Sequence, residues 1–263
     1  MIKIENVEVV GWEAAIRGMR NPMNSWKKSD SECLFHALPN YSYDDPKAEE
    51  YTRYLDDYNL NLKLGPNDHS LMMRLRNAGT DHRKFMRMIT VYLDITAPLY
   101  WWKEFDTYKV GSVANSCSTM HKIHAKEFTM DDFSHDKLID IWGFEPDVRD
   151  LAPVVEADVK TDVPCHYVYG PDNILTLTVN MLNKLRELYL KTKDKTYWYT
   201  MIQLLPSSYN QKRTVMLNYE VMANIYKSRK DHKLDEWRDF CSWIETLPYS
   251  ELITGYMADK EEK

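Results

Sequence analysis

The sequence predicts an α/β (α+β) protein in which a few strands accompany several longer helices. Two segments, 2–10 and 89–95, alternate apolar and polar residues with the period of two that marks a half-buried strand. Other segments repeat apolar residues at helical spacing, most clearly over 173–190. The chain also has 8 Gly against 18 Tyr, 14 Met and 8 Trp. That mix is typical of a helical protein with an aromatic interior.

Helices make up most of the remaining elements that we expect. Each combines an apolar face at helical spacing with a turn or capping residue at one end. In chain order the expected helices are 12–19, 46–58, 66–79, 99–107, 173–190, 197–205, 208–228 and 236–247. Asn67 or Asp68 is expected to cap the third of these, and Asp172 or Asn173 the fifth.

The chain of 263 residues is interpreted as a single domain over 1–263 with two irregular insertions, at about 27–66 and 125–170. Both segments are polar and contain proline, and the second has a very short strand predicted at Val154–Val155. Arg17 and Arg20 close the helix at 12–19, where they could meet an anion or stay solvated.

The segment 94–124 is the most unusual part of the chain. Pro98 ends the second predicted strand because proline has no N–H to donate. The helix at 99–107 is rich in aromatic residues, and 110–120 is small and polar, which predicts a loop whose side chains bond to backbone or to a ligand. Together they are a common way to build a binding wall. The alternative is that the aromatic residues are core and the loop is surface.

The predicted helix at 208–228 carries a second candidate feature. Asn218, Met222, Ile225 and Arg229 recur at i, i+4, i+7 and i+11, which places an amide and a guanidinium on one face, and Asn224 on a neighbouring face. Buried Asn and Arg need partners. The pattern therefore indicates a site.

Charge and motif content exclude several classes of protein. The net charge of −6 argues against a protein that coats long nucleic acid. No Gly-rich phosphate loop, GxSxG, HExxH or DxDxDG motif is present, so any nucleotide has to be held by side chains and helix ends. His121 and His124, with Glu127 nearby, match no metal motif, and we expect no metal.

The cysteines and the lengths of the apolar segments indicate the cellular compartment of the protein. The four cysteines lie far apart with no CxxC pair, which excludes zinc-knuckle and thioredoxin-like sites. No apolar run approaches the ~20 residues of a membrane span, and charged residues stand where a signal peptide needs an apolar core. We expect a reducing, cytoplasmic setting and no membrane partner. Cys117 is a possible nucleophile, but no sequence feature lowers its pKa.

The order of elements and several motifs resemble the flavin-dependent thymidylate synthases. That family has a strand ending in Ala-Pro, a helix with a Gln, an RHR triplet, a Ser three positions on, and an N-E-x-S-x-R run. With Ala97-Pro98 placed on the family's Ala-Pro, the family motifs fall without gaps on Glu104 (Gln), Thr107-Tyr108-Lys109 (RHR), Ser112 (Ser) and 114–119 (N-E-x-S-x-R). Only the last basic residue of the triplet is kept.

The second half of the chain resembles the family more closely. There the family has Leu-Pro, then Arg, Asn, Asn and Arg at fixed spacing, and later Gln-Trp. The matching residues are Leu205-Pro206, Arg213, Asn218, Asn224, Arg229 and, with one residue inserted, Glu236-Trp237. The resemblance covers about half of the chain.

The resemblance implies a ThyX-like core: a small mixed or antiparallel sheet with long helices, in a homotetramer whose sites lie between subunits. In the family FAD and dUMP bind there, methylenetetrahydrofolate supplies the carbon, and NADPH reduces the flavin. By this resemblance Asn218, Asn224, Lys109, Ser112 and Asn115 are expected to bind the flavin or its phosphates. Arg229 is expected to contact the nucleotide base and act in catalysis, with Glu104, Cys117 and Ser118 on the substrate side.

The departures from the family pattern leave two main hypotheses. The loss of two members of the triplet, and Thr119 in place of an arginine, removes charge-assisted contacts worth roughly 1.5–3 kcal/mol each. One hypothesis is a divergent enzyme that binds FAD and a dUMP-like pyrimidine nucleotide and transfers a one-carbon or reducing group. The alternative is a catalytically inactive protein that binds a nucleotide or a partner protein. A structural protein with an aromatic core is the third interpretation.

Overall fold

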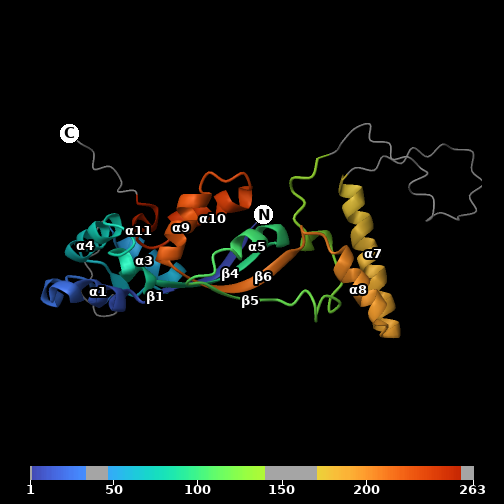
Figure 1. Ribbon diagram of the computed structural model, residues 1–263, viewed down its shortest axis with the longest axis horizontal. Helices are drawn as coiled ribbons and strands as arrows, with labels where there is room; N and C mark the ends of the chain where they lie inside the picture. Colours follow the sequence, from blue (N-terminus) through green and yellow to red (C-terminus); the bar gives the residue numbers. More distant parts are fainter. Residues whose placement is uncertain (1, 34–46, 140–170, 256–263) are drawn as a thin grey trace, which may run out of the picture. The chain divides into compact units, whose positions relative to one another are not determined.

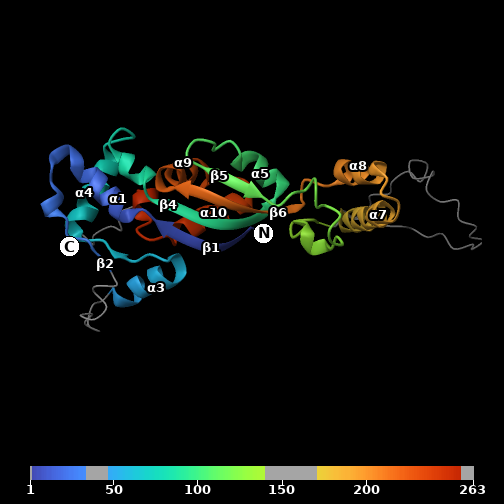
Figure 2. The same cartoon turned by 90° about the horizontal axis from the view of Figure 1, so that it is seen from below.

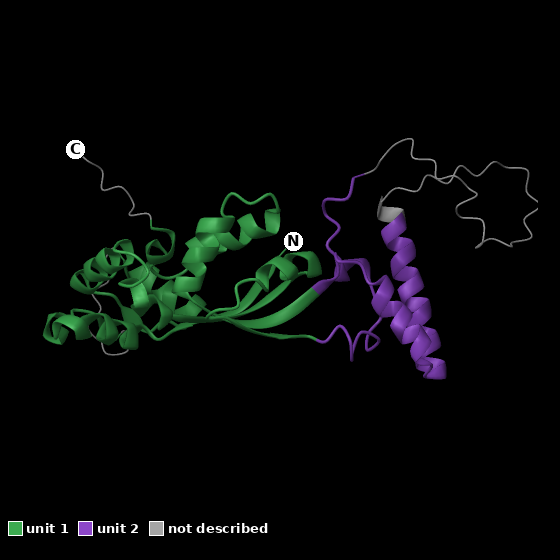
Figure 3. Cartoon of the chain, in the orientation of Figure 1, with its two compact units in different colours: residues 1–117, 211–263 green, residues 118–210 purple. Residues whose placement is uncertain are grey.

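The computed structural model describes residues 2–33, 47–139 and 171–255, which Figures 1 and 2 show in two views. Contacts divide the chain into two compact units, coloured separately in Figure 3. Unit 1 comprises Met1–Cys117 and Gln211–Lys263, and unit 2 comprises Ser118–Asn210. The single domain with two insertions stays a prediction. The predicted strand at Val154–Val155 lies outside the described residues.

Unit 1 is built on a four-stranded sheet with the order β1-β4-β6-β5 (Figure 2). Its strands are β1 (Lys3–Val10), β4 (Thr90–Pro98), β5 (Val113–Ser116) and β6 (Asn210–Asn218). β1 pairs antiparallel with β4, and β5 pairs antiparallel with β6. The alternation that predicted β4 is seen in its burial: Val91, Leu93 and Ile95 are at most 1% exposed. The predicted small antiparallel sheet is confirmed.

Helices α5, α9 and α10 lie over one face of this sheet (Figure 1). The α-helices described in unit 1 are α1 (Trp12–Arg20), α3 (Ala48–Tyr58), α4 (Pro66–Asn77), α5 (Leu99–Phe105), α9 (Tyr219–Arg229), α10 (Asp235–Glu245) and α11 (Glu251–Thr254). Shorter elements are η1 (Asn21–Met23), η2 (Trp26–Lys28), β2 (Glu32–Cys33), β3 (Leu62–Lys63) and η4 (Arg83–Arg87). The helices predicted at 12–19, 46–58, 66–79, 99–107 and 236–247 are confirmed to within a few residues.

The aromatic residues of α5 form the centre of the core. Trp101 and Trp102 are at most 1% exposed, and the Trp101 ring lies 4.7 Å from the ring of Trp237 on α10. Trp102 also donates from Nε1 to the carbonyl of Gln211 at 2.9 Å, which joins α5 to β6. For these aromatic residues the alternative interpretation, that they are core, is the correct one.

The helix predicted over 208–228 is wrong in its first half. That half is strand β6, which lies between β4 and β5 in the sheet. Its residues Val215 and Leu217 are buried, and Thr214 is exposed. Asn218 is the N-cap of α9, where its side chain accepts a hydrogen bond from the Val221 N–H at 3.0 Å. Met222 and Ile225 are buried in α9, whereas Asn218 precedes the first residue of the helix.

Two smaller expectations are also wrong. The loop predicted at 110–120 contains β5, an exposed edge strand whose Ala114 lies opposite Val215 of β6. Main-chain pairing requires no apolar side chain, so the polar composition hid the strand. The N-cap of α4 is Gly65, because Asp68 is buried and paired with Arg20.

The outer face of the sheet carries a polar network around Asp94 of β4. Thr214 donates to one oxygen of Asp94 at 2.6 Å and Asn6 to the other at 2.9 Å, and Lys212 Nζ lies at 3.1 Å. These hydrogen bonds, in that order, lower the pKa of Asp94 to about 2. The ionised carboxylate therefore stabilises the folded chain.

We expect this stabilisation to depend on pH. Because the pKa is depressed in the folded state, the contribution is complete above the ordinary aspartate pKa and is lost as the pH falls through about 2. Asp94→Asn should lower the free energy of unfolding at pH 7 by about 1–2 kcal/mol. Thermal unfolding from pH 7 down to 2 should show wild type and variant converging below pH 4. Asp56→Asn, on an exposed position of α3, is the control, and an equal effect there would contradict the assignment.

Unit 2 is a helical hairpin with its own core. It contains η5 (Met130–Asp132), α7 (Pro171–Thr192) and α8 (Lys195–Leu204), so the helices predicted at 173–190 and 197–205 are confirmed. Its core residues are Ile123, Phe128, Phe133, Leu175, Val179, Leu182, Leu185 and Met201. Asp194 caps α8 by accepting from the Thr196 N–H at 2.8 Å. The predicted caps of α7, Asp172 and Asn173, have side chains outside the described set.

Candidate functional site

Arg229, at the end of α9, is the centre of one group of polar side chains in unit 1. Its Nη1 donates to Oε2 of Glu104 at 2.5 Å, and its Nε donates to the Tyr108 hydroxyl at 3.0 Å. The guanidinium also lies over the ring of Trp237, 4.7 Å from the ring centroid, a favourable cation–π position. The Arg229 side chain is 19% exposed.

The same oxygen of Glu104 is shared by further groups. Trp237 donates to Oε2 from Nε1 at 3.0 Å, and Nε2 of His232 lies 3.5 Å away. His232 accepts from the Leu234 N–H through Nδ1, which fixes the orientation of its ring. Glu104 and Arg229 therefore satisfy each other's charge within one chain.

The small-residue loop after α5 meets helix α9 directly. Asn218 donates from Nδ2 to the carbonyl of Gly111 at 3.3 Å, and Ser112 donates from its hydroxyl to the carbonyl of Tyr108. Gly111 has φ of +79°, and a Cβ there would lie 2.8 Å from Asn218 Nδ2. The loop and the helix thus meet through contacts between their own atoms.

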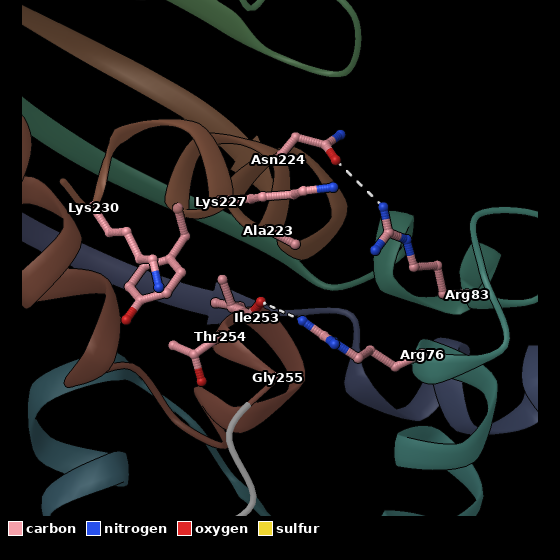
Figure 4. Close-up of a pocket in the computed structure, with 10 residues that line it drawn as sticks. Arg76, Arg83, Ala223, Asn224, Lys227, Lys230, Ile253, Thr254 and Gly255 are labelled. Carbon is pink, nitrogen blue, oxygen red and sulfur yellow. Dashed lines mark hydrogen bonds between the residues drawn. The ribbon is translucent and has the colours of Figure 1, made fainter. Parts of the chain in front are cut away.

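A second group of polar side chains surrounds Asn224, on another face of α9. Asn224 lines a cavity of about 420 Å³ within unit 1. The basic residues around this cavity are Arg76 of α4, Arg83 of η4, and Lys227 and Lys230 of α9 and its end (Figure 4). We call this cavity with its four cations the basic pocket. Ile253, Thr254 and Gly255 at the end of α11 close its lower side (Figure 4).

Internal contacts hold the two arginines of the basic pocket in place. Arg83 forms an ion pair with Glu220, at 2.9 Å, and donates to Oδ1 of Asn224 at 3.3 Å. Arg76 donates to the carbonyls of Leu252 and Ile253, at 3.2 and 3.1 Å. Burial and then the like charge of Arg83 lower the pKa of Arg76, while Glu220 acts in the opposite direction. The pocket is therefore electropositive.

The site residues expected from the sequence lie in the Arg229 group, at the loop–helix contact, in the basic pocket or on the exposed surface. Glu104 and Arg229 are in direct contact, and Asn218 and Ser112 lie on the loop–helix contact beside them. Asn224 is the one that lines the basic pocket. The side chains of the remaining expected residues are all exposed: Lys109, Asn115, Cys117 and Ser118. Asn115 lies in β5, opposite Thr214 of β6, and Ser118 is the first residue of unit 2.

Several residues of these groups were not expected. Lys227 and Lys230 follow Asn224 at steps of three along α9, a spacing that places them on one helix side and was visible in the sequence. Arg76 and Arg83 come from a distant part of the chain, and no local pattern connects them to α9. Tyr108 lies in the triplet aligned with the RHR motif, and His232 follows Arg229 by three residues, but neither was expected to contact the Arg229 group.

The described residues show neither a metal site nor a membrane-spanning helix. Within 2–33, 47–139 and 171–255, no group of three or more His, Cys, Asp and Glu has the arrangement of a metal site. No helix in those ranges is both long and apolar enough to cross a membrane. Cys241 is buried, and burial raises its pKa to about 12, which makes its thiol unreactive at neutral pH.

Solved structures of thymidylate synthases share the fold of the chain. A structure of Thymidylate Synthase X (ThyX) from Helicobacter pylori with FAD and dUMP has a TM-score of 0.56 and 13% identity, over 97% of this chain and 98% of that one. A second, of flavin-dependent ThyX from Helicobacter pylori complexed with FAD and dUMP, has a TM-score of 0.55 and 14% identity, over 95% and 99% of the two chains. No protein-family model and no curated protein sequence matches. The chain therefore has a ThyX-like α/β fold.

Proposed function

We propose that the protein binds FAD and a pyrimidine nucleotide such as dUMP. The observation that carries the proposal is the basic pocket: Asn224, matched to a flavin contact by the resemblance, lines a cavity with four cationic side chains. The fold adds support, because the two similar structures are described as complexes with FAD and dUMP. In this proposal the triplet Thr107-Tyr108-Lys109 is a degenerate form of the family's RHR motif.

The residues of the basic pocket fit the chemistry of FAD. Arg83 holds Oδ1 of Asn224, so the amide nitrogen is left to donate to an oxygen of the ligand, and the cations suit the diphosphate. A volume of about 420 Å³ lies within the range of small-molecule pockets, roughly 300–1,000 Å³. Bound FAD would supply electron and hydride transfer. NADPH and methylenetetrahydrofolate belong to the proposal only if the family reaction is retained.

The proposal includes assembly into a homotetramer, as in the family. Lys109 and Asn115 are exposed on the loop and edge strand after α5 and are not among the residues that line the basic pocket. In a tetramer with sites between subunits, they would reach the ligand of a neighbouring copy. The mass of the protein in solution, measured by light scattering, should then be four times that of the chain.

A second candidate function is a catalytically inactive binder on the same fold. It is favoured by the pairing of Arg229 with Glu104, because a guanidinium already neutralised by a carboxylate is a weak partner for a nucleotide base. Conversion of dUMP to the methylated nucleotide by the purified protein with FAD, NADPH and methylenetetrahydrofolate would eliminate this candidate.

FAD titration tests the proposed function directly. The purified protein should be yellow, or should quench the fluorescence of added FAD with saturation. Asn224→Ala should weaken FAD binding about tenfold, because it removes a hydrogen bond and the group that orients Arg83. Asn180→Ala, on an exposed position of α7, should bind FAD like wild type. A colourless protein that leaves FAD fluorescence unchanged would refute the proposal.

A further inference from the structure

The charges of the basic pocket are only partly neutralised by the described chain. Among its cations, Arg83 has a carboxylate partner, Glu220, which is buried beside it. The hydrogen-bond partners of Arg76 are two main-chain carbonyls and the amide of Asn77, all of them neutral. These bonds fix the guanidinium without neutralising it, and the carboxylate of Glu220, which raises its pKa, is already paired with Arg83.

Lys227 supplies a second positive charge that has no ion-pair partner among the described residues. Its side chain is exposed on α9, one turn after Asn224, and makes no ion pair with a described residue. In Figure 4 its amine and the guanidinium of Arg83 extend into the same region, between α9 and η4. No acidic side chain is among the described residues that line the pocket.

Like charges gathered in this way lower stability unless an anion joins them. The pKa of Arg76 is lowered by burial and by Arg83, which is the electrostatic cost of holding the two guanidinium groups near each other. Fixed guanidinium groups bind phosphate oxygens through charge-assisted hydrogen bonds, and a lysine amine adds a point charge. An amide donor beside them, Nδ2 of Asn224, suits a further oxygen of the same anion.

We infer that the basic pocket binds the phosphate or diphosphate group of the ligand, through Arg76, Lys227 and the amide of Asn224. The inference rests on the proposed function in one respect, since it assigns the phosphate end of the proposed nucleotide or FAD to this pocket. It also explains how a chain with a single basic residue left in the RHR position can hold such a group. The cations come from α4, η4 and α9 in unit 1.

Calorimetric titration with inorganic pyrophosphate, and separately with inorganic phosphate, tests the inference without a flavin. Wild type should bind pyrophosphate, and binding should weaken as the salt concentration rises. Lys227→Glu should weaken it at least tenfold, since it removes one cation and adds a repelling charge. Lys195→Glu, with the same change of net charge at an exposed position of unit 2, should bind like wild type. Tighter binding of pyrophosphate than of phosphate identifies a diphosphate site, and the reverse identifies a monophosphate site.

The outcomes separate this inference from the proposed function. Pyrophosphate that does not bind, or that binds Lys227→Glu and Lys195→Glu equally, overturns the phosphate site. FAD and dUMP that both bind Lys227→Glu as tightly as wild type also overturn it, while the proposed function stands. Pyrophosphate binding that depends on Lys227 in a protein that takes up no FAD supports the phosphate site and refutes the flavin. Lys227 is exposed, so its replacement leaves the core intact, which a thermal unfolding curve of the variant should verify.

Discussion

Replacing Asp68 by Ala is expected to lower the free energy of unfolding by about 3–5 kcal/mol, the range for breaking a buried ion pair. Asp68 is fully buried and Arg20 is 3% exposed, and the two are joined by hydrogen bonds of 2.7 Å. The other carboxylate oxygen accepts from the hydroxyls of Ser29 and Ser31 and from the N–H groups of Asp30 and Ser31. Removal of the carboxylate leaves the buried cation of Arg20 without its ion-pair partner and several hydrogen-bond donors without an acceptor.

The pKa of Asp68 supports the expected size of this effect. Burial alone would raise the pKa, but hydrogen bonds from Ser31, Ser29 and Arg20 outweigh it, so the net shift is downward. The folded chain thus stabilises the ionised form even in a buried position. Asp68→Asn, which keeps the shape but not the charge, should lose less stability than Asp68→Ala.

Chemical denaturation together with hydrogen exchange of β4 peptides measures this loss in unit 1 alone. Glu187→Ala is the matched control, because its ion pair with Lys184 on α7 is about two-thirds exposed on both sides. That variant should change stability by less than about 0.5 kcal/mol. A loss below about 1 kcal/mol for Asp68→Ala would show that the loop 26–31 relaxes to hydrate Arg20, and would contradict a rigid buried pair.

The comparison of sequence and structure shows what local patterns can and cannot predict. Strands β1 and β4 were predicted because apolar and polar residues alternate over much of 2–10 and 89–95. The strand β6 was missed because Val215 and Leu217 run directly into the apolar residues of α9, so the period of two was read as the start of a helix. Asn218 marks the change, since it is the N-cap of α9.

The candidate sites depended more on tertiary contacts than the elements did. The contact of Arg229 with Glu104 joins the end of α9 to α5, and nothing local to either helix specifies it. Arg76 reaches the basic pocket because α4 packs against α11, whose last carbonyls it binds. The family resemblance located Asn224 and Arg229, but it gave no sign that a carboxylate at 104 would occupy the guanidinium.

Replacing Glu104 by Gln is expected to tighten dUMP binding about tenfold, if Arg229 contacts the nucleotide as proposed. In wild type the guanidinium gives its charge-assisted hydrogen bond to Glu104. A glutamine in the same place still accepts from Trp237 and Arg229, but it leaves the positive charge of Arg229 uncompensated. A charge-assisted bond is worth roughly 1.5–3 kcal/mol, and about 1.4 kcal/mol corresponds to a tenfold change in affinity.

Calorimetric titration of dUMP into Glu104→Gln and into Glu236→Gln measures this effect with a matched control. Glu236 is buried on α10 and accepts from the Tyr100 hydroxyl without contacting Arg229, so its replacement makes the same change of charge nearby. The double variant Glu104→Gln/Arg229→Gln should lose the gain, because the guanidinium is then absent. Equal dUMP affinity in wild type and Glu104→Gln would mean that Arg229 serves only to fix α9 against α5, and the nucleotide would have to bind elsewhere.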